Sequence, residues 1–150
     1  MPADSKLITR RHRVSVEFRH VDLMGVVHNA VYFNWFELGR LQVVEEVIPV
    51  QGALHRFLAV PVVVNHCEYI HPARYLDRLV VTTTHRLLPE WSGRFVFNHS
   101  ISHEKSKNEI CRGHSAVTVT DTRSMRVLKE LPEDIWARYL GLTSTSSISF

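Results

Sequence analysis

The residues best suited to chemistry lie in the stretch EFRHVDLMGVVHNAVYFNWFELGR, positions 17–40. A β-like run ends at a single acid, Asp22, followed by Gly25 and by an apolar helix that we expect to begin near Asn29. Free backbone N–H groups at a helix start carry positive partial charge and attract anions. A loop that doubles back at Gly25 would hold Asp22 across a gap from those donors, with room for a carbonyl group between them.

Such a gap suits acyl transfer. Preorganised N–H groups stabilise an oxyanion while a carboxylate attacks the carbonyl carbon or activates a water molecule. The simpler alternative is that Asp22 forms an Asx-type turn and has only a local structural role. Asp22 lies too far before the expected helix to be its N-cap. The residues alone leave both interpretations open.

The surrounding pattern predicts a long helix within an antiparallel sheet. Residues 12–19 alternate apolar and polar side chains, which is typical of a half-buried strand. Apolar residues between 29 and 48 cover most of the helical circumference, so this helix should be buried on nearly every side. Strand-like runs follow at 57–70, 77–88, 94–104 and 109–122, and a short helix at 132–140. We therefore expect an α+β fold in which about five strands wrap around one central helix.

Composition narrows the class of protein. The 150 residues are 45% hydrophobic and 22% charged. This length and composition fit a single domain, which we expect to cover residues 1–142. The low-complexity segment 143–150 is expected to be a flexible tail. No apolar run approaches the roughly 20 residues that span a bilayer. The basic N-terminal residues have no apolar segment behind them, so we expect a cytoplasmic protein and no secretory signal.

Charge and ligand patterns argue against two further classes. The net charge is +3, and the basic residues are scattered rather than gathered in a stripe with exposed aromatic side chains, so nucleic-acid binding is not expected. Cys67 and Cys111 form neither a disulfide framework nor a zinc motif. His99 and His103 share a strand face but lack a third ligand at a standard spacing. We expect no metal and no organic cofactor.

The sequence resembles the hotdog-fold thioesterases of the 4-hydroxybenzoyl-CoA thioesterase-like superfamily. The motif that carries the resemblance consists of Val16, Phe18, Asp22, Gly25, Val26, Val27, Tyr32, Phe36, Glu37 and Arg40. Two later fragments, EYIHPARYLDRLVV and VTVTDTRSMRVLKELPEDI, also resemble family segments, in the first of which a tyrosine, Pro-Ala and an aspartate recur. The resemblance covers roughly residues 12–140, nearly the whole chain.

The resemblance implies hydrolysis of a thioester carried by CoA or by an acyl carrier protein. Asp22 would be the nucleophile or general base, and the backbone N–H of Asn29 would bind the oxyanion. His28 departs from the family's usual aromatic residue; it would polarise the thioester or contact the acyl group, or else be a surface turn residue. The resemblance also implies that the substrate contacts Gly25, Val26, Val27 and Tyr32, and that the chain forms a homodimer or homotetramer.

Two alternatives remain within the same fold. A hydratase or dehydratase acting on an acyl thioester pairs an acid with a histidine; Asp22 and His28 are present, but the usual Asn-Pro between them is absent. A non-catalytic acyl-CoA-binding module would need no acid. The acid at the matching position favours hydrolysis. The sequence leaves open the acyl group, the thiol carrier and the choice between dimer and tetramer.

Overall fold

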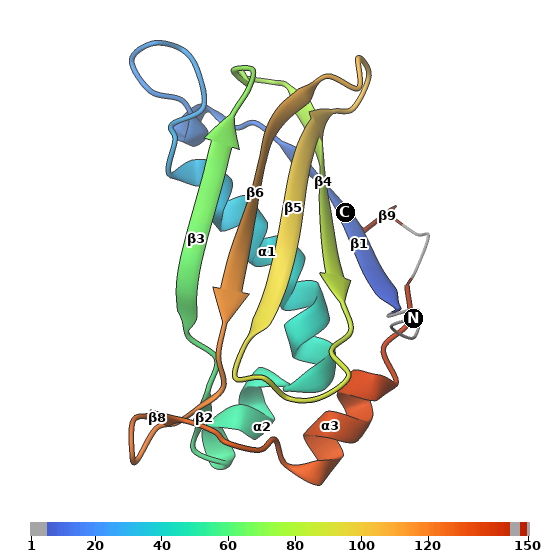
Figure 1. Cartoon of the computed structure of the whole chain (residues 1–150). Helices are drawn as coiled ribbons and strands as arrows, with labels where there is room; N and C mark the ends of the chain where they lie inside the picture. Colours follow the sequence, from blue (N-terminus) through green and yellow to red (C-terminus); the bar gives the residue numbers. More distant parts are fainter. Residues whose placement is uncertain (1–5, 145–147, 150) are drawn as a thin grey trace.

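The computed structural model describes residues 6–144 and 148–149, and its main feature is a six-stranded sheet in the order β3-β6-β5-β4-β1-β9 (Figure 1). Five of these strands are long and antiparallel to their neighbours, whereas the short β9 runs parallel to β1. The strands are β1 (Leu7–Ser15), β3 (Val62–Tyr69), β4 (Arg78–Arg86), β5 (Phe95–His103), β6 (Glu109–Val117) and β9 (Ile148–Ser149).

One long helix, α1 (Val31–Val47), crosses one face of this sheet (Figure 1). The short 3-10 helix η1 (Phe18–His20) precedes it. Near the C-terminal end of α1 lie two shorter helices and a small second sheet, which are α2 (Val50–His55), α3 (Glu133–Leu140), β2 (Leu58–Ala59), β7 (Thr120–Asp121) and β8 (Arg126–Val127). A long helix held against an antiparallel sheet is the hotdog fold, which confirms the predicted fold class. No helix among the described residues is both long and apolar enough to cross a membrane.

The buried side of α1 is a stripe with helical spacing rather than its whole circumference. Its buried residues recur once per helical turn, singly or as adjacent pairs, as for a helix that packs on one face; they are Tyr32, Trp35, Phe36, Gly39, Arg40, Val43 and Val47. Leu38 and Leu41 lie on the other side and are exposed. The expectation of burial on nearly every side is therefore wrong, because the sheet covers only one side of the helix.

Two glycines allow close packing around α1. A Cβ atom at Gly39 would collide with the Thr83 hydroxyl of β4. A Cβ atom at Gly113 would collide with the backbone oxygen of His66 and would lie 2.8 Å from the ring of Phe36. Neither site has room for a larger residue unless the sheet or the helix moves.

A layer of buried polar side chains divides the core into two apolar clusters. The ring nitrogens of His99 lie 2.9 Å from the Thr83 hydroxyl and 2.8 Å from the Ser115 hydroxyl, and the ring stacks on Phe36. Burial, together with the nearby cation of Arg40, lowers the pKa of His99 to about 3. This imidazole is therefore neutral at ordinary pH.

Stability should consequently fall as the pH drops from 7 toward 4. Burial also lowers the pKa values of His12 and His85 below 6.5. His99 binds a proton near pH 6.5 in the unfolded chain but only near pH 3 in the folded chain, so between these points it removes up to about 1.4 kcal/mol of unfolding free energy per pH unit. His12 and His85 act in the same direction. Urea unfolding at several pH values measures the slope, and His99→Gln should flatten it. An equal slope in parent and variant would exclude His99 as a cause.

Several strand limits differ from the sequence pattern. The strand expected at 12–19 corresponds to β1, which begins earlier, at Leu7. The prediction missed its first half because the inward-facing positions include Arg10 and His12 and so lack apolar alternation. Arg10 is satisfied there by Glu46 of α1 at 2.8 Å. The run 57–70 divides at Pro61 into β2 and β3, with a register shift between Val62 and Val64, because proline has no N–H to donate within a strand ladder.

Parts of the C-terminal segment contact β1, and the predicted flexibility of residues 143–150 stays a prediction. Residues 145–147 and 150 of the predicted tail lie outside the described residues. The Ser144 hydroxyl accepts the N–H of Thr9 and donates to the carbonyl of Leu7, and Ile148 and Ser149 pair with Arg11 and His12. Backbone groups at the outer edge of β1 thus form hydrogen bonds with the C-terminal segment, and composition alone does not predict such bonds.

Candidate active site

Asp22 begins a tight hairpin loop. Val21 pairs with Val27 across the loop, and the Asp22 N–H donates to the carbonyl of Val26 at 2.9 Å. The Gly25 N–H donates to the carbonyl of Asp22 at 3.0 Å, and Gly25 has φ +74. That left-handed conformation is cheap for glycine and closes a short hairpin loop. The chain therefore doubles back at Gly25, as the sequence predicts.

The Asp22 carboxylate makes an Asx-type turn, and Asp22 also borders an open hollow. Its Oδ1 accepts the N–H of Met24 at 2.8 Å, a bond that fixes the side chain relative to the loop. A carboxylate offers two oxygens, so Oδ2 is left for other contacts. The two roles considered for Asp22 are thus compatible.

The helix start is held by His28. Its Nδ1 accepts the N–H of Ala30 at 3.1 Å, its carbonyl accepts the N–H of Val31 at 3.0 Å, and its own N–H donates to the carbonyl of His20 at 2.9 Å. Helix α1 begins at Val31, two residues later than the sequence suggested, because these bonds form a turn before the regular helix. Within the described chain the N–H of Asn29 has no hydrogen-bond acceptor.

Asp22 and Asn29 border the same open hollow, which we call the site hollow. Its volume is about 500 Å³. Its walls are Asp22, Val26, Val27, Asn29, Tyr32, Tyr69, Ile70, His71 and Pro72. The structure therefore brings together five of the seven residues suggested for the site. Gly25 and His28 are not part of this lining. Gly25 forms the turn of the hairpin loop, and His28 bonds to the first residues of the helix start.

Four lining residues come from the end of β3 and the loop after it, and the site prediction did not include them. The most informative is Tyr69, whose hydroxyl donates to the carbonyl of Asn29 at 2.8 Å. Its ring packs edge-to-face on Tyr32 at 5.4 Å. Tyr69 belongs to the fragment EYIHPA, in which a tyrosine recurs in the resembled family. The recurrence of this tyrosine was the sequence signal that could have identified Tyr69 as a site residue.

The electrostatics of the site hollow keep both tyrosines neutral. Burial raises the pKa of Tyr32 to about 12 and that of Tyr69 to about 12. Their hydroxyl groups are therefore donors or acceptors, not bases, at ordinary pH. Asp22 is the only carboxylate in the lining. The arrangement offers one acid, one free backbone donor and an aromatic and aliphatic wall, which suits a carbonyl group with an apolar substituent.

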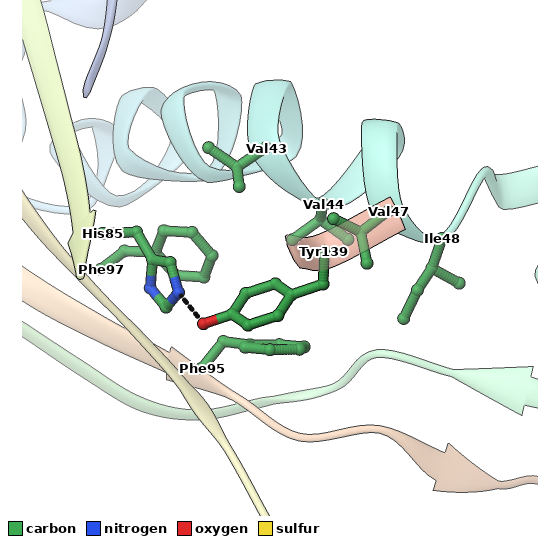
Figure 2. A pocket seen from close by; sticks show the side chains of 8 residues that line it. All are labelled: Val43, Val44, Val47, Ile48, His85, Phe95, Phe97 and Tyr139. Atoms are coloured by element: carbon green, nitrogen blue, oxygen red, sulfur yellow. Dashed lines mark hydrogen bonds between the residues drawn. The ribbon is translucent and has the colours of Figure 1, made fainter. Parts of the chain in front are cut away.

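A second, enclosed gap lies at the far end of α1 and does not resemble a binding site (Figure 2). Its space for a solvent-sized molecule is about 10 Å³, at the lower limit for one water. Tyr139 donates to His85 Nε2 at 2.8 Å and accepts the N–H of Leu88, while His85 Nδ1 donates to the carbonyl of Val96. Because these polar atoms already have partners, the gap is a packing feature of the core.

Sequence comparison places this chain in a family. The chain belongs to the Thioesterase-like superfamily, which it matches over residues 16–139. No curated protein matches the sequence.

Solved structures with the same fold include three informative ones. A hypothetical protein from Thermus thermophilus is 26% identical with a TM-score of 0.73, covering 89% of this chain and 99% of that one. A 1,4-dihydroxy-2-naphthoyl-CoA thioesterase from Synechocystis is 19% identical with a TM-score of 0.75, covering 89% and 97%. A hypothetical protein from Staphylococcus aureus, determined in complex with CoA, is 14% identical with a TM-score of 0.75, covering 91% and 84%.

Proposed function

We propose that this protein hydrolyses an acyl or aryl thioester of CoA, or of an acyl carrier protein, to a free acid and a thiol. The observation that carries the proposal is that Asp22 and Asn29 line one hollow, and that the N–H of Asn29 has no acceptor among the described residues. Membership of the Thioesterase-like superfamily supports the same reaction. So do fold neighbours that include a CoA thioesterase and a CoA complex.

The chemistry requires a base or nucleophile and an oxyanion donor. In the first route Asp22 removes a proton from water, the water oxygen bonds to the carbonyl carbon, and the C–S bond then breaks to release the thiolate, which takes up the proton. In the second route the Asp22 carboxylate attacks the carbonyl carbon, and the C–S bond breaks to release the thiolate and leave a mixed anhydride. Water then hydrolyses this anhydride to the free acid and the Asp22 carboxylate, and the proton released from water goes to the thiolate. In both routes negative charge develops on the carbonyl oxygen, where the Asn29 N–H stabilises it.

The remaining residues hold the substrate or the site. Val26, Val27 and Tyr32 offer an apolar wall for the acyl group, and Gly25 permits the turn that points Asp22 inward. The Nδ1 of His28 accepts the N–H of Ala30, so we assign His28 to the support of the helix start. Neither route needs a metal or an organic cofactor, because water is the second substrate.

A direct test supplies the purified protein with a panel of acyl-CoA and aryl-CoA thioesters and a thiol reagent, so that free CoA gives a colour. Matched acyl-carrier-protein substrates are assayed in parallel. Release of thiol from at least one thioester supports the proposal. Binding without release would favour an acyl-CoA-binding module. Conversion of an enoyl thioester without release of thiol would favour a hydratase.

The protein should assemble through β3 into a homodimer or a dimer of such dimers. β3 is the last strand on its side of the sheet, and Val62 and Val63 on it are exposed. An unpaired strand edge readily adds a second strand. Sedimentation velocity at micromolar concentration should show two or four copies, and Val63→Glu should shift the population toward monomer. A fully active monomer would contradict the proposed assembly.

A further inference from the structure

We infer that Tyr69 is a positioning residue for the oxyanion donor, because its hydroxyl ties the Asn29 segment at the start of α1 to strand β3. The inference rests on the proposed function, since it concerns how the Asn29 N–H is held for catalysis. Tyr69 touches the peptide chain rather than the reacting atoms in this role.

The bond between Tyr69 and Asn29 joins two distant segments. The two residues are 40 positions apart, and the Tyr69 hydroxyl lies 2.8 Å from the carbonyl oxygen of Asn29. The Tyr69 ring packs edge-to-face on the ring of Tyr32. Since burial raises the pKa of Tyr69, the hydroxyl keeps its proton and remains a donor.

The Asn29 segment has a particular need for such a tie. The bonds that His28 makes with Ala30 and Val31 are local to the turn and move with it. The bonds that link this part of the chain to the rest lie before Asn29, at the N–H groups of Val27 and His28. Among the described contacts, the bond from Tyr69 alone attaches Asn29 itself to the sheet.

The His28–Asn29 peptide group is also aligned for catalysis. Its carbonyl accepts the N–H of Val31 at 3.0 Å, which leaves the N–H of Asn29 pointing the opposite way in a trans peptide. A hydrogen bond to the carbonyl polarises the peptide and strengthens its N–H as a donor. Catalytic groups must stay within about 0.5 Å of their productive positions, and a misplacement of about 1 Å costs on the order of a hundredfold in rate.

A simple lining role for Tyr69 makes a different prediction. If Tyr69 only contacted the acyl group, loss of its hydroxyl would change KM and leave kcat nearly constant. If it positions the oxyanion donor, the same change lowers kcat and leaves KM nearly constant, because the donor acts mainly on the transition state.

The test compares Tyr69→Phe with a matched control, Tyr75→Phe. Tyr75 lies on the loop after β3 and is 50% exposed, against 49% for Tyr69. No hydrogen bond joins the Tyr75 hydroxyl to another described residue. Tyr69→Phe should lower kcat by about ten- to a hundredfold, with KM within about twofold and a similar melting temperature. Tyr75→Phe should match the parent. A kcat within twofold of the parent for Tyr69→Phe, or a change confined to KM, would overturn the inference.

A second measurement tests the tie without any substrate. Amide hydrogen exchange should be faster at Ala30 and Val31 in Tyr69→Phe than in the parent, and unchanged in Tyr75→Phe. Unchanged exchange in Tyr69→Phe would also overturn the inference. If the parent releases no thiol from any thioester, the proposed function fails, whereas the exchange result still decides whether Tyr69 holds the turn.

Discussion

The Asp22→Asn variant is expected to lose most of its thioester hydrolysis. Asparagine keeps the size of the side chain, and its amide oxygen can still accept the Met24 N–H that now bonds to Oδ1. It cannot act as a base or as a carboxylate nucleophile. General-base catalysis typically contributes about 10²–10⁴-fold, so kcat should fall by at least about a hundredfold. KM should change little, because the rest of the site hollow is intact.

The matched control is Asp121→Asn at the opposite end of the molecule. Asp121 Oδ1 accepts the N–H of Arg123, two residues later, as Asp22 Oδ1 does with Met24. This variant removes a carboxylate from the same kind of turn and should retain activity within about twofold. If a folded Asp22→Asn protein also stays within a few-fold of the parent, Asp22 has only its turn role. An acyl-binding module would then be the better assignment.

The second large effect concerns stability, which Gly113→Ala should lower strongly. The added Cβ would collide with the His66 backbone oxygen and press on the Phe36 ring. Strand β6 is paired on one side with β3 and on the other with β5, so it cannot easily move away. Overpacking of a core typically costs about 1–3 kcal/mol, and a collision with backbone places this change at about 3 kcal/mol or above. Urea unfolding with the linear extrapolation measures the loss.

Gly52→Ala is the corresponding control. Gly52 lies in α2, and a Cβ atom there meets no atom within 4 Å. Alanine favours a helix over glycine by about 1 kcal/mol, so this variant should be as stable as the parent or slightly more so. A Gly113→Ala protein within about 1 kcal/mol of the parent would show that the sheet and the helix have more freedom than their packing indicates.

The elements that carry strong periodicity were predictable, and those that break it were not. The strand over Phe95–His103 alternates buried and exposed positions along most of its length. The long apolar segment predicted the helix over Val31–Val47, but not which of its sides is buried. The beginning of β1 does not, since Arg10 and His12 face inward. The short helix α2 begins directly after Pro49, and a proline at this place commonly follows a helix end without indicating that a second helix begins. Local signals thus mark the end of one element more reliably than they indicate the type of the next element.

The site shows the same division. Asp22, Val26, Val27, Asn29 and Tyr32 are close in sequence, so a hairpin and a helix start are enough to bring them together. Tyr69 and His71 reach the hollow through the pairing of β3 with β6 and the return of the chain after it. Sequence alternation indicates which face of a strand a residue occupies, but not which loop it meets. The bond from Tyr69 to Asn29 therefore required the structure.

The different edges of the sheet have a consequence for how large an assembly can grow. Backbone groups on the outer side of β1 are engaged by Ser144 and by the strand β9, whereas β3 is open along its length. A sheet with two open edges can add copies at both and extend into a fibre. A sheet with one open edge can pair with one identical sheet through that edge, and the resulting dimer has no open edge left for further copies. We therefore expect the C-terminal residues beside β1 to limit assembly to the β3 edge, so that deleting them should produce larger oligomers in sedimentation velocity.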